Sequence, residues 1–266
     1  MYSLVVILTL AGALPDRGIF PELLARVTFE HPRAVDPARS WLRVDRAHHV
    51  TTLYDGDDPI ALYATGAADL PSGIREVQGA PSRSEDRDGD GIVDRLDVLV
   101  GAKKLLYNGA RYIERYVSIP YPAGDVPRSE GVCSDTVIRA LRNAGLDLQR
   151  EVHEDILRAP AAYPMVEKVD ASINHRRVRT LLPWFVRHWQ TLPRGTKYLP
   201  GDVVFFDTFP QREGPDHLGV VSDTVGRSGQ PNVINNWTDG ATDAEMDLLS
   251  WVPVTHHFRW GKPQSR

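Results

Sequence analysis

The sequence predicts an α+β fold in which helices come first and antiparallel strands follow. Three stretches carry apolar residues at helical spacing, namely residues 93–116, 133–144 and 178–189. The strand-like stretches after them are residues 202–207, 217–223, 232–237 and 252–260. Helices and strands that are segregated along a chain usually pack as helices against one face of an antiparallel sheet. We therefore expect this two-layer arrangement in the main domain.

The composition is that of an ordinary globular protein. The 266 residues are 42% hydrophobic and 25% charged, which is enough apolar material for a packed core. The net charge is −4 and no basic block stands out, which argues against nucleic acid as the main ligand. The length allows one large domain, or a small domain and a medium one.

The chain begins with an apolar run at residues 4–10, followed by Ala11-Gly12-Ala13. This combination is typical of a secretory signal peptide, although no Lys or Arg precedes the run. The run is too short to span a bilayer, and no later segment resembles a transmembrane helix. We expect residues 1–14 to be a signal peptide of a protein that is secreted or periplasmic, without stable membrane insertion. A buried strand, or a start codon placed too far downstream, are the alternatives.

Residues 15–80 are expected to form a small β-rich region. Short β-prone segments occur between residues 41 and 66, and Asp55-Gly56 is a hairpin signal because both residues favour positive φ. Residues 71–87 are rich in Pro, Ser, Gly and charge, which predicts a linker. The expected division is thus a β-rich region at 15–80, a linker with an acidic loop at 81–98, and the main domain at 99–266.

Residues 86–97 have the spacing of an EF-hand calcium loop. Carboxylates occupy loop positions one, three, five, nine and twelve, and Gly91 is at position six, where the loop turns sharply. The expected ligands are Asp86, Asp88, Asp90, the backbone carbonyl of Ile92, Asp94 and Asp97. The last ligand is Asp instead of Glu, as in dockerin-like loops. We expect a structural calcium ion and no catalytic cofactor; a solvated acidic loop is the alternative.

Cys133 is the one cysteine in the chain, and it lies at the start of a predicted helix. Ser129 is the expected N-cap, and Gly145 can end the helix. Cys133, Val137, Leu141 and Ala144 fall on one helical face, so the thiol is expected to lie inward at the positive end of the helix dipole. That position predicts a lowered thiol pKa.

A histidine and two asparagines follow on the predicted strands. His217 begins one strand, and Asn235 and Asn236 lie on the next. A thiol-dependent hydrolase needs a nucleophile, a base and a group that orients the base, and the chain offers these in order. Adjacent residues of a strand face opposite ways, so one asparagine at most can orient His217.

In this order the motifs resemble the NlpC-type cell-wall cysteine peptidases, a papain-like group that also includes the CHAP amidases. The resemblance covers roughly residues 100–260. The matching segments are Pro120-Tyr121 with Gly124, Gly131-Val132-Cys133-Ser134, residues 199–206 and His217-Leu218-Gly219-Val220. Residues 121–127, 152–155 and 173–178 are similar to a bacterial subgroup described as a domain of unknown function.

The resemblance implies a papain-like fold and a role for each site residue. Cys133 would be the nucleophile and His217 the base that takes its proton. Asn235, in register after an isoleucine, would orient the imidazole, with Asn236 as the other choice. Tyr121 would line the substrate groove. The Asp that follows Cys133-Ser134 departs from the usual Cys-Ser-Gly, which leaves the substrate open.

The implied function is hydrolysis of a peptide or amide bond in bacterial peptidoglycan, with the stem peptide as the binding partner. One alternative is an inactive, calcium-stabilised module that binds the cell wall or a partner. Another is an L,D-transpeptidase, because residues 129–133 are similar to its Ser-x-Gly-Cys signature. Against this, an extra residue separates Gly131 from Cys133, and no histidine lies between His49 and Cys133.

Overall fold

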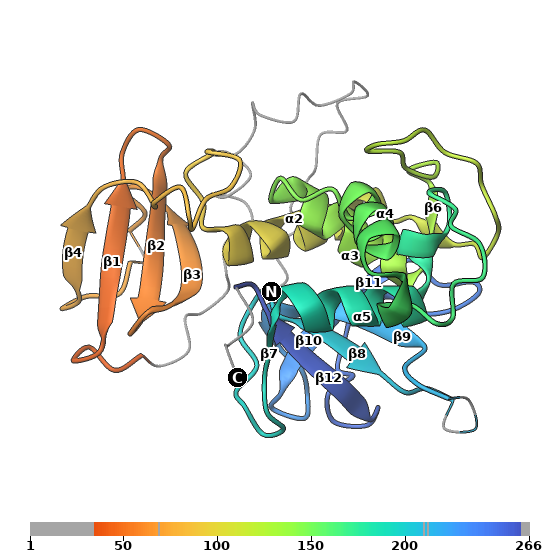
Figure 1. Ribbon diagram of the computed structural model, residues 1–266. Helices are drawn as coiled ribbons and strands as arrows, with labels where there is room; N and C mark the ends of the chain where they lie inside the picture. Colours follow the sequence, from red (N-terminus) through yellow and green to blue (C-terminus); the bar gives the residue numbers. More distant parts are fainter. Residues whose placement is uncertain (1–34, 69, 210, 212, 262–266) are drawn as a thin grey trace.

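The computed structural model describes residues 35–261 except residues 69, 210 and 212. The expected signal peptide at residues 1–14 lies outside the described residues. Two main sheets and four α-helices make up the described part of the chain (Figure 1). The prediction of a mixed α+β fold is confirmed.

The larger sheet has six strands in the order β11-β10-β9-β8-β12-β7, and neighbouring strands are antiparallel. The strands are β7 (Gln190–Thr191), β8 (Val203–Phe206), β9 (His217–Val225), β10 (Pro231–Asn236), β11 (Asp243–Met246) and β12 (Val254–Arg259). The four predicted strands correspond to β8, β9, β10 and β12. The sequence did not indicate β11, because its Asp-Ala-Glu-Met segment is poor in β-formers.

The helices are α2 (Asp94–Asn108), α3 (Cys133–Asn143), α4 (Leu148–Arg158) and α5 (Val178–His188), with short 3-10 turns η1 (Pro160–Ala162) and η2 (Asn174–Arg176). The helix predicted to run from residue 93 to 116 is wrong in its second half. It ends at Asn108 because Gly109 takes a left-handed conformation, with φ 60°, and donates its N–H to the Leu105 carbonyl. Helix α4 was not predicted, although Asp147 caps it and Leu148, Val152 and Ile156 have helical spacing.

The helices cover one face of the six-stranded sheet (Figure 1). A smaller cluster of buried apolar side chains covers the other face. Alternation along the strands produces both layers: Val203 and Phe205 pack with the helices, whereas Val204 and Phe206 face the other side. Helix α3 lies against α2 and against β9 and β10. The start of α3 is therefore held beside the strands that carry the predicted His and Asn residues.

The smaller sheet consists of β1 (Ser40–Asp45), β2 (Val50–Asp55), β3 (Asp58–Ala64) and β4 (Arg75–Gln78), in the order β3-β2-β1-β4. Part of the predicted linker is thus a strand, because β4 pairs in parallel with β1. In Figure 1 this sheet (orange) lies at the N-terminal end of α2. Its inner face carries Val50, Tyr54 and Leu62, which belong to the same buried cluster as the helices.

A two-stranded parallel ribbon joins the end of α2 to the segment before Cys133. It is formed by β5 (Arg111–Tyr112) and β6 (Glu130–Gly131), with Tyr112 opposite Gly131. Within the described ranges, no helix is long and apolar enough to cross a membrane.

Candidate active site

Cys133 is the first residue of α3, and its side chain is buried. The backbone N–H groups of Leu218 and Ser134 lie within hydrogen-bonding reach of its sulfur. The predicted cap, Ser129, is wrong: the helix begins after Val132, whose N–H donates to the Asp135 carboxylate at 2.8 Å. The start of α3 is thus capped by the side chain of Asp135, which lies in the first turn of the helix itself.

Burial dominates the ionisation of the thiol. Desolvation raises the pKa of Cys133 to about 12, although the N–H groups of Leu218 and Ser134 act in the opposite direction. The prediction of a lowered pKa is therefore wrong for the site as the structure shows it. The N-terminal partial charges of α3 do not compensate for placing a thiolate in a largely apolar interior.

A buried ion pair fixes the turn that carries Cys133. The Arg176 guanidinium donates to both oxygens of Asp135, at 2.7 Å and 2.8 Å. The Ser134 hydroxyl donates to the Arg176 carbonyl at 2.6 Å. The two residues that follow the cysteine are consequently tied to η2, and the sequence alone did not indicate this role for Asp135.

His217, the first residue of β9, forms a hydrogen bond with Asn235 of β10, with Nε2 and Oδ1 3.1 Å apart. The Asn235 amide nitrogen donates to the Val233 carbonyl, so its oxygen is oriented to accept from the ring. The tautomer that fits has its proton on Nε2 and a lone pair on Nδ1. The Trp237 ring meets the imidazole edge-on, 4.7 Å between centroids.

Burial also controls the charge of the imidazole. Desolvation lowers the pKa of His217 to about 4, and the hydrogen bond that the ring donates to Asn235 and the charge of Asp216 oppose this only in part. Near pH 7 His217 is therefore neutral and the thiol of Cys133 is protonated. A neutral imidazole is the form that can accept a proton.

Asn236 occupies a different environment. Its amide nitrogen donates to the Ala110 carbonyl at 2.9 Å, and its oxygen has no hydrogen-bond partner. It lies on the helix side of β10, like Ile234, whereas Asn235 lies on the face of Val233. Of the two predicted amides, Asn235 is the one that the structure places against His217.

The sulfur of Cys133 lies close to the backbone of the residue that follows His217. Leu218, whose N–H lies beside the sulfur, directly follows His217. Among the hydrogen bonds of the described residues, none joins the sulfur to the ring. Hydrogen bonds between catalytic groups are often long before substrate binds and tighten in the complex.

The predicted groove residue Tyr121 lies away from the thiol. Its ring is 44% exposed and packs on His153 of α4, 4.8 Å between centroids. Tyr112 of β5 is the tyrosine near the nucleophile: burial, followed by the charge of Cys133, raises the pKa of its hydroxyl to about 12. Tyr112 could not be identified from the sequence, because the pairing of β5 with β6 brings it next to Gly131.

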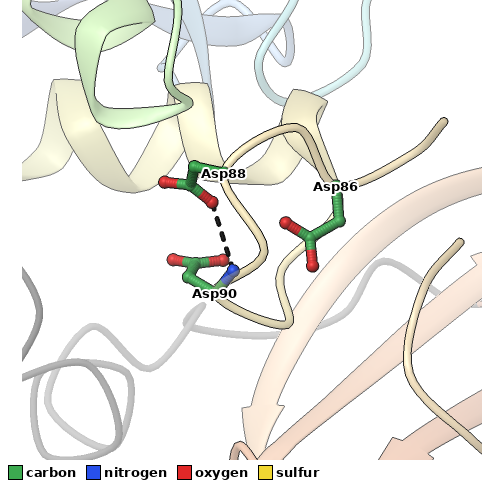
Figure 2. A group of neighbouring side chains, drawn as sticks. All are labelled: Asp86, Asp88 and Asp90. Carbon is green, nitrogen blue, oxygen red and sulfur yellow. Dashed lines mark hydrogen bonds between the residues drawn. The ribbon is translucent and has the colours of Figure 1, made fainter. Parts of the chain in front are cut away.

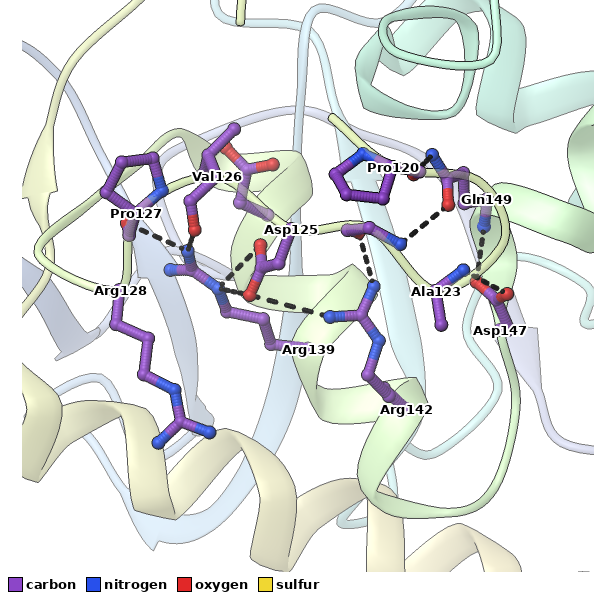
Figure 3. A network of polar contacts seen from close by, with 12 residues as sticks. Pro120, Ala123, Asp125, Val126, Pro127, Arg128, Arg139, Arg142, Asp147 and Gln149 are labelled. Carbon is purple, nitrogen blue, oxygen red and sulfur yellow. Dashed lines mark hydrogen bonds and ion pairs between the residues drawn. The ribbon is translucent and has the colours of Figure 1, made fainter. Parts of the chain in front are cut away.

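The loop that leads to Cys133, residues 120–128, is fixed by polar contacts to α3 and α4 (Figure 3). Arg139 donates to the Asp125 carboxylate at 2.9 Å, and Arg142 donates to the Gly124 carbonyl at 2.8 Å. Gln149 both accepts from the Gly124 N–H and donates to the Pro120 carbonyl. These contacts hold the loop against α3 and α4.

The predicted calcium ligands are only partly gathered. Asp86, Asp88 and Asp90 each place a carboxylate oxygen within 4.8 Å of the others, and Figure 2 shows them around one turn of the loop. Asp94 accepts the Arg87 N–H at 2.7 Å, and the N–H of Ile92 donates to Asp90 at 2.9 Å. Asp97 lies on the first turn of α2, where it is buried.

Residues 99–260 match the model of a family described as Domain of unknown function (DUF1287). The chain belongs to this family. The match includes Cys133, His217 and Asn235, whereas the acidic loop at 86–97 lies before it.

One curated protein and two solved structures are also similar to the chain. This DUF1287 protein is 41% identical over 168 residues to "Uncharacterized protein YijF" of Escherichia coli (strain K12), which covers 61% of this chain and 80% of that protein. NlpC2 and NlpC1 from Trichomonas vaginalis are similar structures at 17% identity, with TM-scores of 0.39 and 0.38. These matches cover 81% of this chain but only 58% and 56% of theirs.

Proposed function

We propose that this DUF1287 protein is a thiol hydrolase with a papain-like domain that cleaves a peptide or amide bond in bacterial peptidoglycan. The observation that carries the proposal is the hydrogen bond between His217 and Asn235 on the strands next to the helix that begins at Cys133. These are the parts that nucleophilic catalysis by a thiol requires.

In the proposed reaction, Nδ1 of His217 takes the thiol proton as the sulfur of Cys133 attacks the carbonyl carbon. The imidazolium then gives this proton to the leaving amine, which departs and leaves a thioester. Water, deprotonated by the same imidazole, hydrolyses the thioester and restores the thiol. Asn235 holds the ring through Nε2 during both proton transfers.

Tyr112 is assigned to the same site. Burial and the charge of Cys133 raise the pKa of its hydroxyl to about 12, so it stays protonated as a hydrogen-bond donor. A donor at this place can bind the oxygen of the scissile carbonyl or an adjacent group of the substrate. Tyr121, which is exposed on the approach loop, would contact substrate farther from the thiol.

The cellular setting is part of the proposal. The apolar run at residues 4–10 and the resemblance to cell-wall peptidases support an exported protein that acts in the periplasm or outside the cell. Peptidoglycan lies in that compartment, and its stem peptide supplies the amide bonds that such a site would cleave.

The test is digestion of purified, dye-labelled sacculi by the wild-type protein and by Cys133→Ala. We expect soluble fragments with the wild type and none with the variant, while both give the same circular dichroism spectrum. Mass spectrometry of the fragments then identifies the bond that is cut. Equal release by both proteins, or none by the wild type, contradicts the proposal.

The buried, protonated state of Cys133 supports a second proposal, an inactive module that binds the wall or a partner. In that case both the wild type and Cys133→Ala would sediment with sacculi, and neither would release fragments.

A further inference from the structure

The acidic loop between the small sheet and α2 concentrates negative charge. One carboxylate oxygen from each of Asp86, Asp88 and Asp90 lies within 4.8 Å of the other two (Figure 2). Backbone N–H groups of Gly89, Gly91 and Ile92 hold these carboxylates in place by donating to Asp86 and Asp90. At such distances the carboxylates repel one another unless a cation neutralises them.

Asp97 gives an independent indication of a cation. Its side chain is 1% exposed; one oxygen accepts from the Asn143 amide, and the other, Oδ2, has no hydrogen-bond partner. Asp97 lies in the first turn of α2, directly after the acidic loop. A buried carboxylate oxygen without a partner costs several kcal/mol in proteins, and a metal ion removes this cost.

The loop touches three parts of the molecule. Asp97 binds Asn143 at the end of α3, and a Cβ atom at Gly145 would lie 3.0 Å from Asp88. A Cβ atom at Gly91 would lie 2.5 Å from the His48 ring, which belongs to the turn between β1 and β2. The carboxylates thus sit where the small sheet, α2 and α3 meet.

We propose that Asp86, Asp88, Asp90 and Asp97 bind one calcium ion, which holds the small sheet, the start of α2 and the end of α3 together. The Ile92 carbonyl and Asp94, through a water molecule, would complete the ligand set as the loop spacing predicts. This inference is independent of the hydrolase proposal, because none of the ligands contacts Cys133 or His217.

The donor set favours calcium among common cations. All donors are oxygen, and carboxylates predominate, which suits a hard divalent ion. Five or six oxygen ligands from the loop and the first turn of α2 fit the irregular coordination of Ca²⁺, whereas Mg²⁺ requires a near-ideal octahedron and releases its waters reluctantly. Lys104, whose charge opposes that of Asp90 and Asp97, supplies one positive charge against four carboxylates.

The first experiment is isothermal titration of the chelator-treated full chain with CaCl₂, and separately with MgCl₂. We expect one calcium site with a dissociation constant at or below about 10⁻³ M, and weaker binding of magnesium. At a hundredfold excess of calcium over that constant, the melting temperature should rise by about 5–10 °C. Absence of both the binding heat and the thermal shift at millimolar calcium overturns the proposal.

Matched variants test the ligands. Asp88→Asn and Asp97→Asn keep the shape of each side chain and remove one charge, and each should weaken calcium binding at least tenfold. Asp57→Asn, in the exposed turn between β2 and β3, is the control and should bind as the wild type does. Unchanged binding by Asp97→Asn means that Asp97 is not a ligand, which overturns the inference even if the loop binds calcium.

Hydrogen exchange tests the bridging role. Calcium should slow exchange at residues 47–49 and 142–145 as well as within the loop. Protection confined to residues 86–97 contradicts a link between the three parts.

Discussion

At the residue scale, burial sets the chemistry of the site. The thiol of Cys133 and the imidazole of His217 are both shifted toward their neutral forms by desolvation. The site therefore resembles a general-base pair more than a preformed thiolate–imidazolium pair. The sequence analysis mispredicted the direction of the thiol pKa, because the helix dipole is visible in a sequence, whereas the depth of burial is not.

These shifts predict a pH dependence for the proposed hydrolysis. His217 must be neutral to accept the thiol proton, and its pKa lies near 4, so kcat/KM should rise as the pH increases through about 4. Since the Cys133 pKa lies near 12, no second change is expected from the thiol up to about pH 10. Initial rates of fragment release between pH 3.5 and 10 measure this profile. A bell-shaped profile of kcat/KM with both limbs between pH 6 and 8 would instead indicate a thiolate–imidazolium ion pair of Cys133 and His217.

Substitution of Asn235 should mainly lower activity, whereas substitution of the adjacent Asn236 should mainly lower stability. Asn235→Ala removes the group that orients His217, so kcat should fall by roughly two to four orders of magnitude while the fold is kept. Asn236→Ala leaves the buried Ala110 carbonyl without that donor, so it should lower the free energy of unfolding by about 1–3 kcal/mol and preserve more activity. Fragment release and urea unfolding of both variants provide the measurement, and the reverse pattern would reassign the orienting residue.

At the element scale, the position of α3 depends on contacts that the sequence did not reveal. The continuous apolar runs of β8 and β9 were readable because each strand is buried on both faces. Asp135 and Tyr112 were not identified, because their partners lie on η2 and on a ribbon paired across the chain. Local patterns define elements, and only tertiary contacts define which residues gather around the thiol.

The Asp135–Arg176 pair should be among the most sensitive contacts of α3. Both side chains are almost fully buried, so Asp135→Ala leaves an uncompensated guanidinium and should cost roughly 3–5 kcal/mol. The control is Glu154→Ala, which breaks the exposed pair with Arg158 and should cost at most about 1 kcal/mol. Chemical denaturation compares the two, and equal costs would show that the buried pair does not fix the helix.

At the scale of the whole molecule, the small sheet and the helical layer share one core. The sequence suggested a separate β-rich region, and a linker composition cannot show whether two regions pack together. Val50, Tyr54 and Leu62 of the small sheet lie in the same cluster as Val93 and Leu96 at the start of α2. Arg95 of α2 in turn donates to the Pro200 carbonyl, at 2.6 Å, just before β8.

This shared core predicts a single cooperative unfolding transition. Burial of three large side chains contributes about 5–9 kcal/mol, which is comparable to the total stability of a typical domain, so neither part should persist without the other. Calorimetry should give one peak whose van't Hoff and calorimetric enthalpies agree. Leu62→Ala should lower that one melting temperature through a loss of about 2–5 kcal/mol, whereas Leu157→Ala, at a 60% exposed position on α4, should change stability by at most about 0.5 kcal/mol. An additional early transition in Leu62→Ala, with the main peak unmoved, would mean that the small sheet is an independent unit whose packing leaves the active-site layer unaffected.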